Sequence, residues 1–369
     1  MGFSVRMTVI TTMPLIREEL QMSHAEAGLL LSVLSFFYGI IQFPSGILTD
    51  IYDNKKLLIV VLLSLSISGL GISLSSNIYL LAVSLILSGL LIGFSTPICF
   101  TILSKTFTEK IGTVFGIYET APSLAQSLGT VVAGIIATRY SWHLVYYVWI
   151  ILDLGFVVLI AGFFKKMGIT GEKRVIDRKT IEGFFSNKTL MYFLVVFVMN
   201  SVCSFSVLSM APSFMYEVHG LDVASTAAIF GGTRLLGLVG SFMGGYLSDR
   251  FSKPKLLLFS LGASSMSTYA FAILPFGPWI VGILCLNALS ISIFYPVTYT
   301  LLSELTTPSM RGKAQGLYNT MAFTISSMFP FVMGVVTDLS SFRFAFLLPP
   351  SIGALGAVWI LFLIKKGTS

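Results

Sequence analysis

Long apolar stretches recur along the whole chain, and each can cross the roughly 30 Å hydrocarbon core of a bilayer as a helix of about 20 residues. These stretches constrain the fold, because backbone polar groups inside a bilayer must be satisfied within a helix or a closed barrel. The stretches are continuous rather than alternating, which excludes a membrane β-barrel. Only 11% of the 369 residues are charged, against about 25% in soluble domains, so a soluble enzyme is excluded too. The chain is predicted to be an all-α protein that crosses the membrane many times.

Twelve membrane-spanning helices are expected from these stretches. Their ranges are 1–16, 25–48, 57–75, 78–103, 113–138, 142–164, 189–216, 224–248, 255–275, 279–303, 314–338 and 342–364. The first is short, since it reaches only about 24 Å at 1.5 Å per residue, and it contains Arg6. We therefore expect a truncated first helix, with the given sequence starting inside that helix and an N-terminal segment missing. Pro122, Pro212, Pro296 and Pro330 are expected to break or kink helices.

Basic residues are concentrated on one side of this predicted topology. If the loop after the second span lies in the cytoplasm, 18 of the 23 lysines and arginines face the cytoplasm, three face outward and two lie inside spans. An excess of basic residues in cytoplasmic loops is the positive-inside rule, which places both termini in the cytoplasm. The net charge of +7 is therefore interpreted as a topology signal and not as a nucleic-acid-binding surface. The predicted location is the plasma membrane.

The sequence offers no site for a metal or another cofactor. Its three cysteines lie inside predicted spans without metal-ligand spacing and are interpreted as small packing residues. Its three histidines, His24, His143 and His219, are all expected near the outer face. An ordinary solvated or interfacial role is favoured for them over pH sensing.

Two stretches of sequence recur at equivalent positions. Residues 46–56 read GILTDIYDNKK and residues 245–255 read GYLSDRFSKPK, with their first glycines 199 residues apart. Residues 101–120 likewise match residues 300–320 at two threonines, a serine, two glycines and a tyrosine. Both matches occupy the same place in a unit of six spans, one after its second span and the other across its fourth and fifth. The chain is therefore predicted to contain two related halves.

The two halves are expected to be pseudo-symmetric six-helix bundles, residues 1–164 and residues 189–369. The polar stretch 165–188, with seven basic and three acidic residues, joins them as a cytoplasmic linker. Repeats of this kind occur in secondary transporters, with the substrate site at the repeat interface. Two six-span halves, a basic central loop and Gly-x-Leu-x-Asp in both halves resemble the major facilitator superfamily. The resemblance covers essentially the whole chain and implies the fold of that family, with transport by alternating access.

The repeated motif is similar to the loop motif of this family at the cytoplasmic rim. The matching residues are Gly46, Asp50, Lys55 and Lys56 in the first copy and Gly245, Asp249 and Arg250 in the second. Glycine lets two helices approach closely, and an aspartate at the membrane edge pairs with a cation or a helix N-terminus. We therefore expect a gate that latches the halves together while the outside is open. The first copy departs from the family pattern at Ile51 and Asp53, and a solvated turn with topology-setting lysines is the alternative.

Two arginines, Arg6 and Arg234, lie inside predicted spans, one in each half. Each is about 15 Å below the outer boundary by helix rise, where an ionised side chain costs roughly 2.5–3.5 kcal/mol on insertion scales. The resemblance implies that the first span lines a central cavity and that the eighth flanks it. Two guanidiniums facing one cavity would bind a carboxylate, a phosphate or another oxyanion. The alternatives are structural pairing with Glu119 or Asp153, and snorkelling to an interface.

Other polar residues inside the spans are candidates to complete a substrate pocket. They are Asn200, Asn287, Tyr295, Tyr318 and Asn319. Polar residues in membrane helices also hold helices together, which is the alternative for each of them. Glu119 and Asp153 are candidates for carrying a coupling proton, because a buried carboxylate can take up a proton. A structural hydrogen bond or gate contact fits Glu119 equally well, and neutral packing or pairing is favoured for Asp153.

No motif supports an enzyme, because the chain lacks both a P-loop for ATP and a His-Glu-x-x-His metal motif. The predicted function is secondary active transport of a small anionic solute by alternating access, with proton symport as an added hypothesis. The expected partners are the solute, the lipid bilayer and a proton, and the expected state is a monomer. Two alternatives stay open: proton-driven efflux of amphipathic drugs, and a non-transporting membrane receptor on the same fold.

Overall fold

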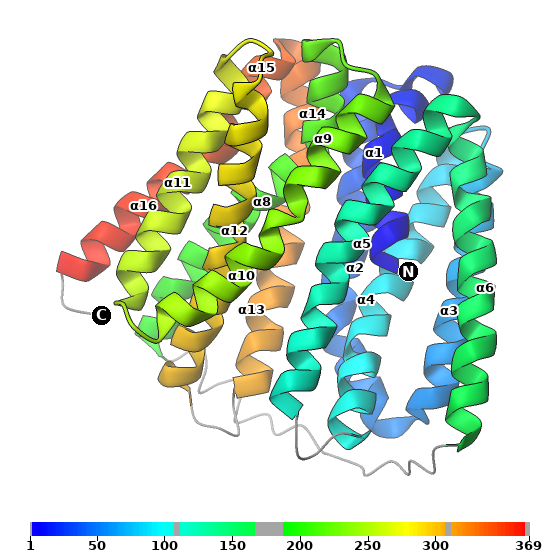
Figure 1. Cartoon of the computed structure of the whole chain (residues 1–369), viewed down its shortest axis with the longest axis horizontal. Coiled ribbons are helices and arrows are strands. Elements are labelled where there is room, and N and C mark those ends of the chain that lie inside the picture. The colour runs from blue at the N-terminus through cyan, green and yellow to red at the C-terminus, as the bar shows by residue number, and fades with distance from the viewer. Residues whose placement is uncertain (1, 107–110, 167–186, 307–310, 366–369) are drawn as a thin grey trace.

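The computed structural model describes residues 2–106, 111–166, 187–306 and 311–365, and this part of the chain forms helices without any strand. Figure 1 shows the long helices lying side by side in one bundle. Ten helical stretches in the described residues are long and apolar enough to cross a membrane. The prediction of an all-α polytopic membrane protein is therefore confirmed.

Each of the first six predicted spans corresponds to one helix. They are α1 (Gly2–Glu19), α2 (His24–Ile51), α3 (Asn54–Ser73), α4 (Ile78–Thr106), α5 (Ile111–Arg139) and α6 (Trp142–Lys166). Capping explains two of the starts, because Ser23 and Glu26 form a capping box at α2 and the Asp53 side chain accepts a hydrogen bond from the Lys55 N–H at α3. Asp53, which departs from the family's loop pattern, thus begins α3.

The last six predicted spans are also helical, but three of them are divided. The helices are α8 (Lys188–His219), α9 (Val223–Arg234), α10 (Leu236–Ser248), α11 (Lys253–Ile273), α12 (Trp279–Leu305), α13 (Arg311–Ser326), α14 (Phe329–Leu339), α15 (Phe342–Ala345) and α16 (Leu348–Lys365). Pro330 and Pro349 each stand in the first turn of a helix that follows a division. Proline lacks a backbone N–H and is tolerated in that turn, which explains the starts of α14 and α16.

The other three prolines expected to break or kink helices lie inside continuous helices. They are Pro122 in α5, Pro212 in α8 and Pro296 in α12. The division between α9 and α10 has no proline, and the Leu235 N–H there donates to the Gly232 carbonyl at 3.2 Å. This hydrogen bond reaches back three residues, as in a 3₁₀-helix, so it tightens the last turn of α9, which ends at Arg234.

Helices pack mainly with helices of the same half. In the N-terminal half α3 packs on α4 and α6, and in the C-terminal half α12 packs on α10 and α11. The main contacts between the halves are those of α5 along α9, α2 along α13 and α14, and α1 along α8. Figure 1 shows α5 beside α9, with α10 leaning away from α5. Beyond Arg234, α10 therefore has few contacts with the N-terminal half.

Glycines allow the halves to meet at one end of the bundle, here called the closed end. It carries the turns at residues 20–23, 140–141, 220–222 and 340–341. A Cβ at Gly134 of α5 would lie 2.2 Å from the Cβ of Ala227 on α9, and one at Gly28 of α2 would lie 2.2 Å from the Pro330 carbonyl oxygen. Such spacing leaves no room for a side chain, so helix backbones touch across the interface.

Candidate functional site

Arg6 lies at the boundary between the two halves. Its side chain extends from α1 and is only 4% exposed. The guanidinium carbon is 5.1 Å from the ring centroid of Tyr38 on α2 and 4.7 Å from that of Phe205 on α8. Both distances allow cation–π contact. Because α2 and α8 belong to different halves, Arg6 touches both of them.

The α1 helix that carries Arg6 is held by α6. The indole N–H of Trp149 donates to the Thr8 hydroxyl at 2.7 Å, and the Thr12 and Tyr146 hydroxyl oxygens are 3.5 Å apart. The Thr8 and Thr12 hydroxyls also donate to carbonyls four residues earlier in α1. Hydrogen bonds between helices of this kind position one membrane helix against another. They fix the register of α1, and with it the depth of Arg6.

Arg234 is the last residue of α9 and is 8% exposed. Its Nη2 donates to the Asn287 side-chain oxygen on α12 at 3.4 Å, and its guanidinium carbon is 4.6 Å from the Phe230 ring centroid. The Asn287 amide nitrogen in turn donates to the Thr268 hydroxyl of α11 at 3.1 Å. Asn287, predicted to contact substrate, therefore connects Arg234 to α11.

Both guanidiniums have buried N–H groups without a hydrogen-bond partner. These groups are Nε and Nη2 of Arg6 and Nε of Arg234. Among the described residues, no carboxylate lies within 4.0 Å of either side chain. Asp153 is 1% exposed on α6 and its Oδ1 has no hydrogen-bond partner, while the side chain of Glu119 lies outside the described residues. Two buried cations that still have donors to offer can bind an oxyanion.

Tyr295 is the other predicted pocket residue that the structure brings close to Arg6. It is half-buried on α12, and it lies with Tyr38 among the side chains near Arg6. Its ring meets that of Phe197 edge-on, with centroids 5.8 Å apart. Asn200 on α8 is fully buried, and neither atom of its amide has a hydrogen-bond partner. The described structure thus groups Arg6 with two tyrosines, one from each half.

Two predicted pocket residues have partners inside the C-terminal half. Tyr318 is 1% exposed, and its hydroxyl donates to the Leu190 carbonyl of α8 at 2.5 Å. The side-chain oxygen of Asn319 accepts a hydrogen bond from the Tyr299 hydroxyl at 3.0 Å. These contacts favour a structural role for both residues over the predicted contact with substrate.

The second copy of the repeated motif lies at the end of α10 and the start of α11. Among the described atoms, nothing lies within 4 Å of a Cβ built on Gly245, whereas one on Gly244 would lie 2.7 Å from the Ile293 carbonyl oxygen. Close helix approach at Gly245 therefore stays a prediction. At this end of α10 it is Gly244 that faces α12 and permits their close approach.

The charged residues of this copy have contacts within the C-terminal half. Asp249 is the C-cap of α10, and the guanidinium carbon of Arg250 lies 4.2 Å from the Tyr246 ring centroid. The adjoining Lys253 forms an ion pair with Glu304 at 2.8 Å, which joins α11 to α12. The contacts of Arg250 and Lys253 with described residues thus support local structure.

The first copy of the motif is only partly described. Lys55 is half-buried and Lys56 is exposed at the start of α3. Gly46 and Asp50 lie in α2, but their side chains fall outside the described residues. The latch between the halves therefore stays a prediction.

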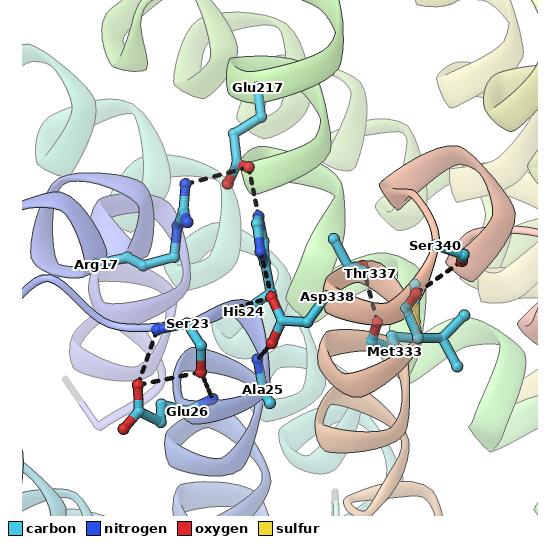
Figure 2. Close-up of polar contacts among 11 residues, drawn as sticks. Arg17, Ser23, His24, Ala25, Glu26, Glu217, Met333, Thr337, Asp338 and Ser340 are labelled. Carbon is cyan, nitrogen blue, oxygen red and sulfur yellow. Dashed lines mark hydrogen bonds and ion pairs between the residues drawn. The ribbon is translucent and has the colours of Figure 1, made fainter.

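A cluster of charged side chains joins the halves at the closed end (Figure 2). We call Arg17, His24, Glu217 and Asp338 the clasp; they come from α1, α2, α8 and α14. His24 Nε2 lies 2.7 Å from Glu217 Oε2, and His24 Nδ1 lies 2.8 Å from Asp338 Oδ1. Arg17 Nη2 lies 3.2 Å from the same Glu217 oxygen. The clasp therefore ties two residues of the N-terminal half to two carboxylates of the other half.

Asp338 also caps α2 from the opposite half. Its carboxylate accepts hydrogen bonds from the N–H groups of His24 at 3.1 Å and of Ala25 at 2.8 Å. Negative charge is favourable at a helix N-terminus. The sequence pattern pointed to His24 but not to Glu217 and Asp338, which are 193 and 314 residues away. One signal was available, since both acids stand at ends of predicted spans on the same side as His24.

Two packed halves of membrane helices, with one buried cation at their boundary and another inside the C-terminal half, are typical of a polytopic membrane transporter of the two-bundle type. The chain matches the family model of the Major Facilitator Superfamily over residues 1–291 and 235–369, and it belongs to that family. The resemblance seen in the repeated motif is therefore confirmed. The family identifies the protein as a membrane transporter and not an enzyme.

Curated relatives match most of the chain at low identity. The hexuronate transporter of Bacillus subtilis is 23% identical over 377 residues, covering 95% of this chain and 89% of that protein. The probable sulfoacetate transporter SauU of Cupriavidus necator is 24% identical over 389 residues, covering 97% and 89%. The membrane sensor protein UhpC of Escherichia coli is 20% identical over 351 residues, covering 86% and 78%.

The fold is also that of a solved transporter. A bacterial homologue of the human lysosomal transporter Spinster, in an inward-facing and unoccupied conformation, matches with a TM-score of 0.86 at 13% identity. The match covers 98% of this chain and 93% of that one. The likeness shows that the twelve predicted spans adopt the fold of the family.

Proposed function

We propose that the protein is a secondary active transporter of a small organic anion, whose acidic group binds Arg6 and Arg234. The observation that carries the proposal is the pair of buried guanidiniums with N–H groups that lack a partner. A buried cation without a counter-charge is costly. A bound carboxylate or sulfonate would supply both the charge and the acceptors. Two of the relatives are named for organic anions, a hexuronate and sulfoacetate, which supports this class of solute.

The placement of the two arginines suits alternating access. Arg6 belongs to the N-terminal half and Arg234 to the C-terminal half. An anion that contacts both guanidiniums would be held by both halves, so its binding free energy would favour conformations that bring the halves together around it. Arg6 already contacts rings from both halves, Tyr38 and Phe205, so movement of the halves would change its surroundings.

We extend the proposal to proton symport by a monomer in the plasma membrane. Asp153 and Glu119 are the candidates for the coupling proton, and the buried Asp153 carboxyl with an unbonded Oδ1 supports a group that can exist in the protonated form. The distribution of basic residues supports cytoplasmic termini. With that topology the closed end faces outward and the repeated motif faces the cytoplasm.

Two other functions make different demands on the same residues. Efflux of amphipathic drugs would need a buried acid and would tolerate loss of both arginines. A receptor on the same fold would bind an anion without moving it, and the relative named as a membrane sensor supports keeping this alternative. The two are separated from anion transport by measuring binding and flux on the same preparation.

The test begins with binding to the purified protein, followed by thermal denaturation. D-glucuronate, D-galacturonate and sulfoacetate are the probes, glucose is the uncharged control, and a cationic amphipathic dye represents the efflux hypothesis. A ligand that binds only the folded protein raises its apparent stability by mass action. We expect stabilisation by at least one anion and none by glucose. Stabilisation by the dye alone would contradict the proposal and favour efflux.

Substitution of the arginines then tests the site itself. Loss of a charged hydrogen bond costs about 1.5–3 kcal/mol, so Arg6→Gln and Arg234→Gln should each weaken anion binding by about 10- to 150-fold. Arg139→Gln, at the exposed end of α5, is the matched control and should bind like the wild type. Uptake into proteoliposomes should fall in parallel with binding. Wild-type affinity in both interior variants would refute the site, and binding without uptake would favour the receptor.

A further inference from the structure

We infer that the clasp is a proton-binding site, and that a proton on His24 holds the closed end together. The three short contacts among the side chains of the clasp all cross between the halves, from Arg17 or His24 on one side to Glu217 or Asp338 on the other. The inference goes beyond the proposed anion site. It shares with the proposed function only the assumption that the halves separate at this end during transport.

The hydrogen-bond geometry of His24 requires two donors. Both ring nitrogens face carboxylate oxygens, at 2.7 Å and 2.8 Å, and an ionised carboxylate can only accept. A neutral imidazole has one N–H and one lone pair. Its N–H can donate to one carboxylate, but the lone pair of its other nitrogen then faces the second carboxylate, which is unfavourable. The imidazolium donates to both. The observed arrangement is therefore complete only when His24 carries the extra proton.

The charges that surround His24 favour the same state. Glu217 from α8 and Asp338 from α14 face the ring, and Arg17 from α1 pairs with Glu217. Two carboxylates and one guanidinium leave one net negative charge, which the imidazolium neutralises. Another neighbour is Phe342 of α15, whose ring packs edge-on at 5.6 Å and adds no charge. On the helix of His24 itself, Glu26 is bonded to Ser23 instead.

The clasp is open to protons from the side of the closed end. Its side chains are 18–30% exposed, so water reaches them without any movement of the halves. Imidazole is the side chain whose charge changes between about pH 5 and 8. At the same end, hydrogen bonds from Ser225 keep the pKa of Asp222 below its usual value, so that carboxylate stays ionised over this range. His143 and His219 also lie at this end, so matched variants are needed to assign a pH response in this range to His24.

Opening of the closed end would break the clasp and leave His24 in water, where a proton binds less tightly than between two carboxylates. By linkage, a proton that binds the closed form more tightly stabilises that form. This contribution is present at low pH and is lost as the pH rises through the range in which His24 loses its proton. With the proposed topology, an acidic medium outside the cell would hold the outer end closed.

Distance measurements between nitroxide labels test the inference without any anion. Tyr79→Cys in α4 and Phe276→Cys in the turn before α12 place labels on exposed positions of opposite halves at the closed end, in a variant whose three native cysteines are replaced. By linkage, the ratio of open to closed molecules can rise by no more than the ratio of the proton affinities of the two states. We expect this ratio to rise severalfold from pH 5.5 to pH 8.5. A ratio independent of pH would overturn the inference.

Matched variants assign the response to His24. His24→Gln should abolish the pH dependence, and Glu217→Gln, which removes one of the two carboxylates, should reduce it. His143→Gln is the control, because His143 also contacts a carboxylate at the closed end, Glu19 at 3.0 Å, but both belong to the N-terminal half. It should respond like the wild type. A full response in His24→Gln or in Glu217→Gln, or its loss in His143→Gln, would each contradict a proton site in the clasp. Failure of anion binding would leave this readout unchanged.

Discussion

Substituting Gly134 by alanine adds one methyl group at one of the tightest contacts between the two halves. Gly134 lies on α5 and faces α9, where its added Cβ would be 2.2 Å from the Cβ of Ala227 and 3.0 Å from the Val223 carbonyl oxygen. Ordinary carbon–carbon contact begins at about 3.5 Å. The helices must therefore separate by more than 1 Å at this point, or the closed end must open.

The cost falls on one conformation of the transporter. Overpacking a tight contact typically costs about 1–3 kcal/mol, and here it is incurred only while α5 and α9 touch. A state in which the closed end has opened no longer contains this contact and is not penalised. The ratio of open to closed molecules should therefore rise by about 5- to 150-fold. The overlap with another Cβ, which belongs to the backbone frame and cannot rotate away, points to the upper part of that range.

The label pair at Tyr79 and Phe276 reports this shift as growth of the population with the longer distance. Gly232→Ala is the matched control, because Gly232 lies on the facing helix α9 and a Cβ there would meet nothing within 4 Å among the described atoms. Its distance distribution should match that of the wild type. If Gly134→Ala also leaves the distribution unchanged, then contact between α5 and α9 does not define the closed state, and the interpretation of the closed end fails.

Two further substitutions separate structural residues from binding residues. Tyr318→Phe removes the hydrogen bond to the Leu190 carbonyl and should lower the free energy of unfolding by about 1–2 kcal/mol without changing anion affinity. Thermal denaturation with and without anion measures both quantities. Lost affinity at unchanged stability would instead support a contact between Tyr318 and the substrate. Asn287→Leu removes the acceptor for Arg234 and should weaken anion binding by about 3- to 10-fold, less than Arg234→Gln does. Titration calorimetry that finds an equal or greater loss would mean that Asn287 touches the anion itself.

The positions of the helices could be predicted because an apolar stretch has few alternatives inside a bilayer. The divisions within helices could be predicted only in part. Pro330 marks the start of α14, where it removes a backbone donor. Pro122 and Pro212 carry the same signal but lie inside α5 and α8, because neighbouring helices can support the altered hydrogen bonding. The end of α9 at Arg234 has no proline and depends on tertiary packing.

The candidate site shows the same distinction between local and distant information. Helix rise alone placed Arg6 and Arg234 inside spans of opposite halves, and the structure shows both side chains buried. Their neighbours could not be predicted, because Phe205 and Asn287 reach them through packing between helices that are distant in sequence. The close approach at Gly244 could not be predicted for a related reason. A motif identifies a glycine pair but not which of the two glycines faces the neighbouring helix.

The interface charges fall into two groups that differ in what neutralises them. At the closed end, Arg17 and His24 meet carboxylates of the opposite half, so this end can close without a solute. In the interior, Arg6 and Arg234 contact aromatic rings and an amide but no described carboxylate. Movement that encloses these two cations is therefore opposed by desolvation unless an anion accompanies them. A proton would thus control closure at the outer end while the charge of the solute controls closure around the interior site, so the two events can be coupled without sharing a residue.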